Sequence, residues 1–413
     1  MTGNINDLSR YSQDDREKSD LINGVLREFK PYHLLKCNYC KPSLDMEDVL
    51  ESSMECDDVG EEPHESHHVV LSEVKLSIED LKVPEPAKYC PECGQQYPNE
   101  EVFCPACLVH LKRISDKIDV CDIKSEPKFI FNGQNNYDSF EDLLNKDNLL
   151  KINEFDFTID DYWTVLHDIK SQAFVNFDNL VKENEIDFDE LDILEKIILF
   201  AKSFVKVEYK SSGSELGYFE SDVISIDDRQ TDSLQITTLL HELSHFLIQE
   251  ILIHVLCKLL GCSRNPFTES LLIFILSYDH FTQLIDEYAA HNVEGRFTVF
   301  GFQDYSSFTQ IEQKMEGERT PGEIEIIKSI GNTFALSIKG ILESLIDREM
   351  REEIKEQFLR EVIDRPNYRA LEMENCQILN DEGFIKAIWL ILNEGCEAAA
   401  SNIGKLASIQ GNR

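Results

Sequence analysis

The segment Thr237-Thr238-Leu239-Leu240-His241-Glu242-Leu243-Ser244-His245-Phe246-Leu247 is the most informative part of this 413-residue chain. Histidines four positions apart project from one face of an α-helix, so the imidazoles of His241 and His245 can bind one metal ion. Glu242 follows the first histidine, where its carboxylate can take a proton from a metal-bound water and pass it to a leaving amine. The motif therefore predicts a catalytic zinc site with an open coordination position.

The sequence around this motif predicts an α+β domain that becomes largely helical towards the C-terminus. Apolar residues from Leu234 to about Leu260 indicate one long helix that ends at Gly261. Strands are expected upstream at 204–210 and 216–226, after a helix that starts near 189. Further helices are expected at 267–277, 281–295, 322–346, 348–363 and 382–408, with shorter helical stretches at 138–151 and 160–182.

The motif and its flanking segments resemble the zincin metallopeptidases over about residues 190–300. This resemblance implies a small sheet beside the active-site helix, a peptidase activity and a third zinc ligand further along the chain. The sequence lacks the His-x-x-Gly-x-x-His continuation of the metzincins. Glu287, followed by small residues at 289 and 290, instead resembles the Glu-x-x-Ala segment of the gluzincins and becomes the expected third ligand. His280 and Asp286 remain rival ligands.

Two further expectations follow from the same resemblance. His291 stands where the family often has Asp or Asn, so it either orients a ligand histidine or is a bystander. The strand at 217–226 would form the sheet edge that receives an extended peptide. His254, nine positions after His245, is better explained as a packed core histidine than as a ligand.

Two Cys-x-x-Cys pairs indicate a second, structural zinc site. Cys90 and Cys93 form one pair and Cys104 and Cys107 the other, and four thiolates supply the complete tetrahedral set of a closed zinc site. The segment resembles the zinc-ribbon family over some twenty residues. Zinc ribbons are stabilisers or adaptors more often than catalysts, because four protein ligands leave no open position.

An incomplete knuckle precedes this ribbon. Cys37 and Cys40 form a third Cys-x-x-Cys pair, and Cys56 begins a possible partner in which Val59 replaces the second cysteine. A histidine at 64, 67 or 68 could supply the fourth ligand of a second structural zinc. The alternative is that this half has lost its metal, because one missing ligand normally abolishes such a site.

Composition sets the broad class of protein. The formal net charge is −38, which disfavours nucleic-acid binding because phosphate backbones need clustered cations. The first twenty residues contain no apolar signal segment, and no membrane span is expected, so the chain is interpreted as cytoplasmic. Three regions are expected: a zinc-ribbon region at 1–125 with an acidic insertion at about 43–86, a helical connecting region at 126–188, and a zincin-like domain at 189–413.

These observations together predict a zinc-dependent metallopeptidase that hydrolyses peptide bonds. His241, His245 and Glu287 would hold the catalytic zinc, and Glu242 would act as general base. The ribbon would dock a protein partner or the substrate. The competing hypothesis is a catalytically inactive zinc-binding adaptor or regulatory protein that keeps the same fold.

Overall fold

The computed structural model describes residues 88–90, 92–98, 101, 103–108, 111–113, 120–210, 217–220, 222–298, 306–314, 320–363 and 378–411. All of them belong to one compact unit, Ala87–Arg413. The expected acidic insertion and the possible second structural zinc site at Cys37, Cys40 and Cys56 lie outside the described residues. The described part is mostly helical and contains two small sheets, which confirms the α+β class.

The first sheet is a minimal ribbon with its own core. Strand β1 (Lys88–Tyr89) pairs antiparallel with both β2 (Gln96–Tyr97) and β3 (Lys112–Arg113). Among the described residues its buried apolar cluster comprises Cys90, Tyr97, Cys104 and Leu111, with Cys107 packed against it. So few buried apolar side chains contribute little stability, and a metal bound by the cysteines would add to it.

The second sheet lies beside the motif helix. Helix α6 (Ile193–Phe204) leads into β4 (Lys206–Tyr209), and the strand order is β4-β6-β5. The expected strand region 216–226 is a hairpin of β5 (Gly217–Glu220) and β6 (Val223–Ile226), which are antiparallel, whereas β4 and β6 are parallel. Strand β5, at one end of this order, contacts the motif helix.

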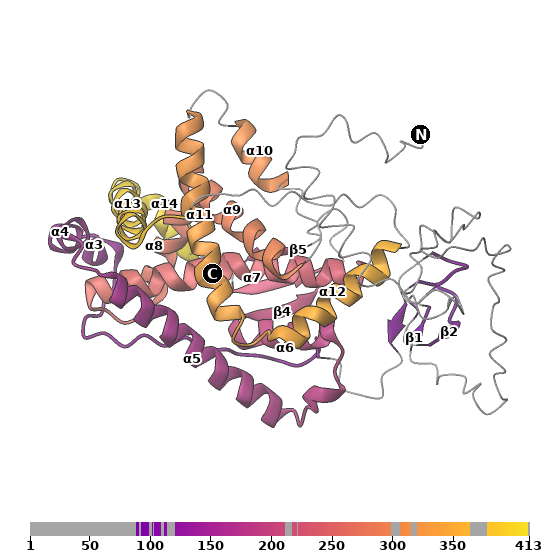
Figure 1. Ribbon diagram of the computed structural model, residues 1–413. Coiled ribbons are helices and arrows are strands. Elements are labelled where there is room, and N and C mark those ends of the chain that lie inside the picture. The colour runs from indigo at the N-terminus through magenta and orange to yellow at the C-terminus, as the bar shows by residue number, and fades with distance from the viewer. Residues whose placement is uncertain are drawn as a thin grey trace, which may run out of the picture. The chain divides into compact units, whose positions relative to one another are not determined.

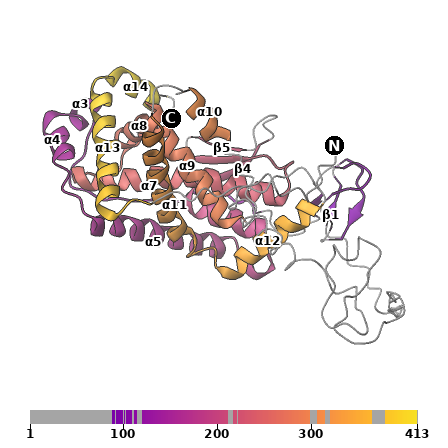
Figure 2. The same cartoon turned by 45° about the horizontal axis from the view of Figure 1, so that its top comes forward.

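The motif lies on α7 (Asp232–Leu260), which runs through the middle of the helical region in Figures 1 and 2. It ends as predicted at Gly261, whose φ of 59° is in the left-handed region that glycine favours. In the described part of the chain, α7 is the one helix long and apolar enough to cross a membrane. However, 83% of its most apolar window is buried inside the protein. A core helix of this kind passes the same test of length and hydropathy.

A distant carboxylate caps the start of α7. The N-cap residue Thr231 makes no side-chain capping bond. Instead Glu361, fully buried on α12 (Arg348–Ile363), accepts a 3.1 Å hydrogen bond from the Ser233 amide and a second bond from the Ser233 hydroxyl. Gln357 donates to the same carboxylate at 2.8 Å. A negative charge at this helix end is favourable because the helix dipole is positive there.

The helix that carries the expected third ligand packs closely on its neighbour. This helix, α9 (His280–Phe297), lies against α11 (Pro321–Leu342). A Cβ added to Gly331 of α11 would lie 2.9 Å from the Ile285 carbonyl oxygen and 3.2 Å from the Ala289 amide nitrogen. Ala289 and Ala290 are fully buried. Small side chains therefore allow close packing of α9, as its sequence predicts.

The remaining helices surround this core. They are α3 (Phe140–Leu143), α4 (Lys146–Glu154), α5 (Ile159–Glu183), α8 (Pro266–Ser277), α10 (Ser306–Lys314), α13 (Asp381–Ala400) and α14 (Ile403–Gly411), with a 3-10 turn at Phe188–Glu190. Two expected helices are each divided in two. Asn145 caps α4 within 138–151, and Asn402 donates to the Ala398 carbonyl within 382–408. Asparagine side chains compete with the backbone for such bonds and interrupt helices.

Candidate metal centres

His241 and His245 lie one turn apart on α7, and their imidazoles face the same point. Their Nε2 atoms are 3.2 Å apart. Both side chains are largely buried, at 14% and 13% exposure. The predicted helix therefore places the two imidazoles on one face, with the same ring nitrogen of each directed to a common position.

Glu287 on α9 completes the group. Its Oε2 lies 3.7 Å from Nε2 of His241 and 4.0 Å from Nε2 of His245. Three ligands of a tetrahedral zinc would be separated by about 3.3 Å, given zinc–ligand bonds of about 2.0–2.1 Å. The three ligand atoms all lie within 4.8 Å of one another, so this histidine cluster can hold a metal ion after small adjustments.

The two rival ligands lie elsewhere. Oδ2 of Asp286 is 2.9 Å from Nδ1 of His245, on the side of the ring that faces away from Glu287. His280 is the first residue of α9 and belongs to none of the potential metal-binding groups among the described residues. Asp286 is therefore placed to orient the His245 ring, a role that carboxylates commonly fill behind ligand histidines.

A second carboxylate, which the sequence motifs do not predict, lies beside His241. Oε2 of Glu294 lies 3.2 Å from Nδ1 of His241 and 3.3 Å from Nδ1 of His291. The Glu294 side chain is only 5% exposed. Glu294 follows Glu287 by seven residues, two turns of the same helix, and this spacing was the available signal. His241, His291 and Glu294 form a second group that could hold a metal, on the opposite side of the His241 ring.

His291 is part of this site. Its ring centroid lies 4.6 Å from that of His241. Its Nε2 is 2.8 Å from the hydroxyl of Ser307 on α10, which in turn donates to Oε2 of Glu287. A hydrogen-bonded path thus connects Glu294, His291 and Ser307 to Glu287. Such a path restrains the orientation of Glu287.

The charges in the histidine cluster favour a bound cation. Burial lowers the pKa of His241, but hydrogen bonds to Glu287 and Glu294 and the nearby charge of Glu242 raise that pKa well above its usual value. Burial also lowers the pKa of His245, but the charge of Asp286 outweighs this effect and raises that pKa to about 9. Burial raises the pKa of Glu287, whereas its hydrogen bond to His241 and both histidine charges lower it well below its usual range. A metal ion would replace the protons that the two histidines otherwise bind.

The cysteine cluster (Cys90, Cys93, Cys104 and Cys107) has the geometry of a closed metal site. Its four sulfur atoms lie within 4.8 Å of one another. Sγ of Cys93 and Sγ of Cys104 are 3.7 Å apart, close to the roughly 3.8 Å expected in a tetrahedral zinc–thiolate site with 2.3 Å bonds. The amides of Cys93 and Cys107 each donate to the sulfur three residues earlier at 3.4 Å.

Tyr97 supports the thiolate form of one cysteine. Its hydroxyl lies 3.2 Å from Sγ of Cys104 and lowers the pKa of that thiol to about 6, although burial acts in the opposite direction. A thiolate is the metal-binding form of cysteine. The other cysteines in the described part of the chain are placed differently: Cys257, Cys262 and Cys396 are fully buried, and Cys121 is half-buried.

His254 is a packed core residue. It is 1% exposed, its Nδ1 bonds to the Glu250 carbonyl at 2.8 Å, and its ring meets Phe131 edge-on. Burial lowers its pKa to about 4, which favours the neutral ring.

No protein-family model matches the chain, and neither does any curated protein or any solved structure. The chemistry of both clusters must therefore be inferred from their own residues.

Proposed function

We propose that this protein is a zinc-dependent peptidase in which His241, His245 and Glu287 hold the catalytic zinc. The observation that supports it most is the convergence of their three ligand atoms beside a buried glutamate, Glu242, that is not itself one of the ligands. Three protein ligands leave one position open, and a zinc ion bound in this way lowers the pKa of a water molecule and polarises a carbonyl.

Glu242 is the general base of the proposed reaction. It adjoins His241 on α7 and lies near enough for its charge to raise the pKa of that histidine. Its carboxylate would accept a proton from the attacking water and donate it to the leaving amine. Asp286 and Glu294 would each hold the Nδ1 side of one ligand histidine and so fix the ring orientation.

The edge strand β5 is the proposed surface for an extended substrate. It pairs with β6 on one side and with no second strand in the described part of the chain. Gly217 brings it close to α7, because an added Cβ would lie 2.5 Å from Cγ2 of Thr238, one turn before His241. A substrate added to this edge would pass near the histidine cluster. The cysteine cluster would hold a structural zinc in a ribbon that docks a partner or substrate.

Elemental analysis tests the two sites separately. His241→Ala with His245→Ala should remove about one zinc per chain, and Cys90→Ser with Cys93→Ser should remove one other. Glu287→Gln should lose the first zinc, whereas Asp286→Asn should retain it with weaker affinity. Unchanged zinc content in the double histidine variant would exclude the proposed catalytic site.

Turnover separates the peptidase from an inactive adaptor. The zinc-loaded protein is incubated with a mixture of synthetic peptides that contains every residue type, and the products are identified by mass spectrometry. Glu242→Gln should keep its zinc and lose cleavage by a factor of roughly 10² or more. A fully zinc-loaded wild type that cleaves none of the peptides would favour the adaptor.

A further inference from the structure

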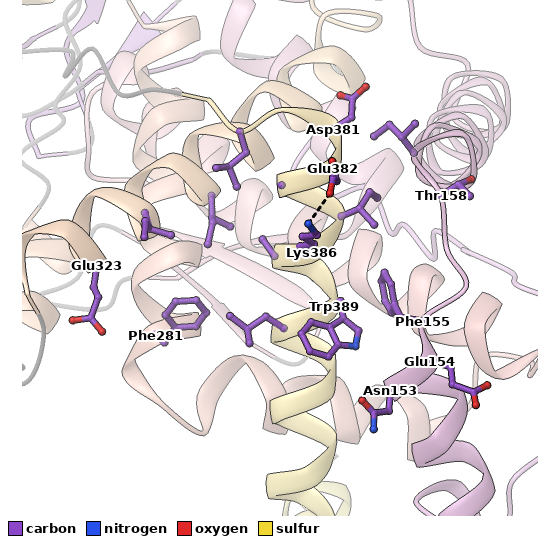
Figure 3. Close-up of a pocket in the computed structure, with 18 residues that line it drawn as sticks. Asn153, Glu154, Phe155, Thr158, Phe281, Glu323, Asp381, Glu382, Lys386 and Trp389 are labelled. Atoms are coloured by element: carbon purple, nitrogen blue, oxygen red, sulfur yellow. Dashed lines mark hydrogen bonds and ion pairs between the residues drawn. The ribbon is translucent and has the colours of Figure 1, made fainter.

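A large apolar cavity lies away from both metal clusters. It has a volume of about 1030 Å³ and is lined by residues of α4, α5, α11 and α13 together with the N-terminal end of α9. Figure 3 shows the side chains of Phe155, Phe281 and Trp389 on its wall. None of its lining residues belongs to the histidine or the cysteine cluster.

Acidic side chains surround this apolar wall. In Figure 3 Glu323 lies on one side, Asp381 and Glu382 on a second, and Glu154 on a third. Among the described lining residues Lys386 is the one basic side chain, and its ammonium is 2.6 Å from the Glu382 carboxylate. The described lining therefore has four carboxylates and one ammonium, an excess of three negative charges.

One feature of the cavity favours a bound partner. Ile326 is 55% exposed at the cavity although it is a large aliphatic side chain, so covering it would remove apolar surface from water.

We propose that this cavity binds a segment of another protein whose apolar side chains are flanked by Lys or Arg. The apolar wall accepts the apolar side chains, and the surrounding carboxylates complement the basic ones. A fatty acid or an anionic lipid has the wrong charge, because its head group would meet the same carboxylates. The proposal does not depend on the proposed peptidase activity.

Phe281, which lines the cavity, lies on α9, the helix that also carries Glu287. Phe281 precedes Glu287 by six residues, or about 9 Å of helix rise. A bound segment would therefore contact one end of α9 without reaching the ligand atoms. This arrangement allows a protein to be held at the cavity while the histidine cluster remains accessible.

Fluorescence of Trp389 tests the proposal directly. The chain has two tryptophans, and Trp163→Phe leaves Trp389 as the only one; Trp163 is 54% exposed, so its replacement is mild. The probe is a synthetic 18-residue amphipathic peptide of Leu and Lys. Its binding should shift the emission to shorter wavelength, whereas a Leu and Glu peptide of equal hydrophobicity and a Lys and Ser peptide of equal charge should not bind.

Variants at exposed positions keep the protein folded. Ile326→Asp should weaken binding of the Leu and Lys peptide at least tenfold. Glu154→Gln combined with Asp381→Asn should weaken it about tenfold at low salt. Asp178→Asn combined with Glu183→Gln, which removes one Asp and one Glu from the distant end of α5, should leave the affinity unchanged. Glu242→Gln should also bind as the wild type does, which separates this site from the metal centre.

Four results would overturn the proposal. If the Leu and Glu peptide bound as tightly as the Leu and Lys peptide, charge would have no role in binding. If the Lys and Ser peptide bound as tightly, the apolar cavity would have no role. A shift of Trp389 emission by oleate would assign the cavity to a lipid. Concentration-dependent dimerisation that Ile326→Asp abolishes, measured by sedimentation, would assign it to a second copy of this chain.

Discussion

Replacement of Gly331 by alanine would place a methyl group between α11 and α9. The new Cβ would meet two backbone atoms, the Ile285 carbonyl oxygen at 2.9 Å and the Ala289 amide nitrogen at 3.2 Å. Backbone atoms cannot rotate away, so the two helices must separate by a few tenths of an ångström. Such overpacking costs about 1–3 kcal/mol. The gain in helix propensity from glycine to alanine offsets about 1 kcal/mol of this.

Gly340→Ala on the same helix is the matched control. It makes the same chemical change at an exposed position where an added Cβ meets nothing within 4 Å. We expect it to raise the free energy of unfolding by about 0.5–1 kcal/mol. Because the propensity gain is common to both variants, the difference between them reports the packing cost, which we expect to be about 1–3 kcal/mol.

The assay is urea denaturation followed by circular dichroism, with zinc affinity measured in parallel. Glu287 is two residues before Ala289, so separation of α9 should weaken zinc binding in the Gly331 variant and leave it unchanged in the Gly340 variant. If the two variants were equally stable, α9 and α11 would not be in the close contact described, and the reasoning would be refuted.

Three further predictions concern buried or paired carboxylates. Glu294→Ala should lower zinc affinity at the histidine cluster by about 10–100-fold, measured by chelator competition, because His241 loses the partner of its Nδ1 atom. Unchanged affinity would count against this role. Glu361→Ala should lower the free energy of unfolding by about 2–4 kcal/mol, because the start of α7 loses its cap and Ser233 is left buried without its partner; a smaller loss than 1 kcal/mol in urea denaturation would contradict it. The hydrogen bond from Lys258 lowers the pKa of Asp161 to about 2, so this pair contributes stability at neutral pH that is lost as the pH falls from about 4 towards 2. Both side chains are a third exposed, so Lys258→Met should lower the free energy of unfolding by at most about 1 kcal/mol at pH 6, and by progressively less below pH 4. If the stability difference between wild type and variant stayed the same in acid, this ion pair would not be its cause.

Local spacing explains what could be predicted from the sequence. The long helix, its end at Gly261 and the alignment of His241 with His245 all depend on residues within a few helical turns. The four cysteines of the ribbon converge because each pair occupies a single tight turn. In these cases the positions of the side chains follow from neighbours in the sequence.

Interactions between distant helices explain what was not predicted. Ser307 reaches Glu287 across 20 residues, through a contact of α10 that no spacing rule contains. The choice between Asp286 and Glu287 depends on the rotation of α9 against α7, which brings Glu287 to the Nε2 side of the histidines and Asp286 to the Nδ1 side of His245. Glu294 could have been found, because it repeats the helical face of Glu287 seven residues later.

The cap that Glu361 places on α7 has a consequence for synthesis of the chain. Ser233 and Glu361 are 128 residues apart in the sequence. A ribosome that adds about 5–20 residues per second therefore needs roughly 6–25 seconds after it has added Ser233 to add Glu361. During this interval the helix that carries both histidines has emerged without its capping partner. The start of this helix is therefore capped only after most of the C-terminal half has been translated. An unfinished chain would carry the histidine cluster on a helix whose first turn still lacks the Glu361 carboxylate.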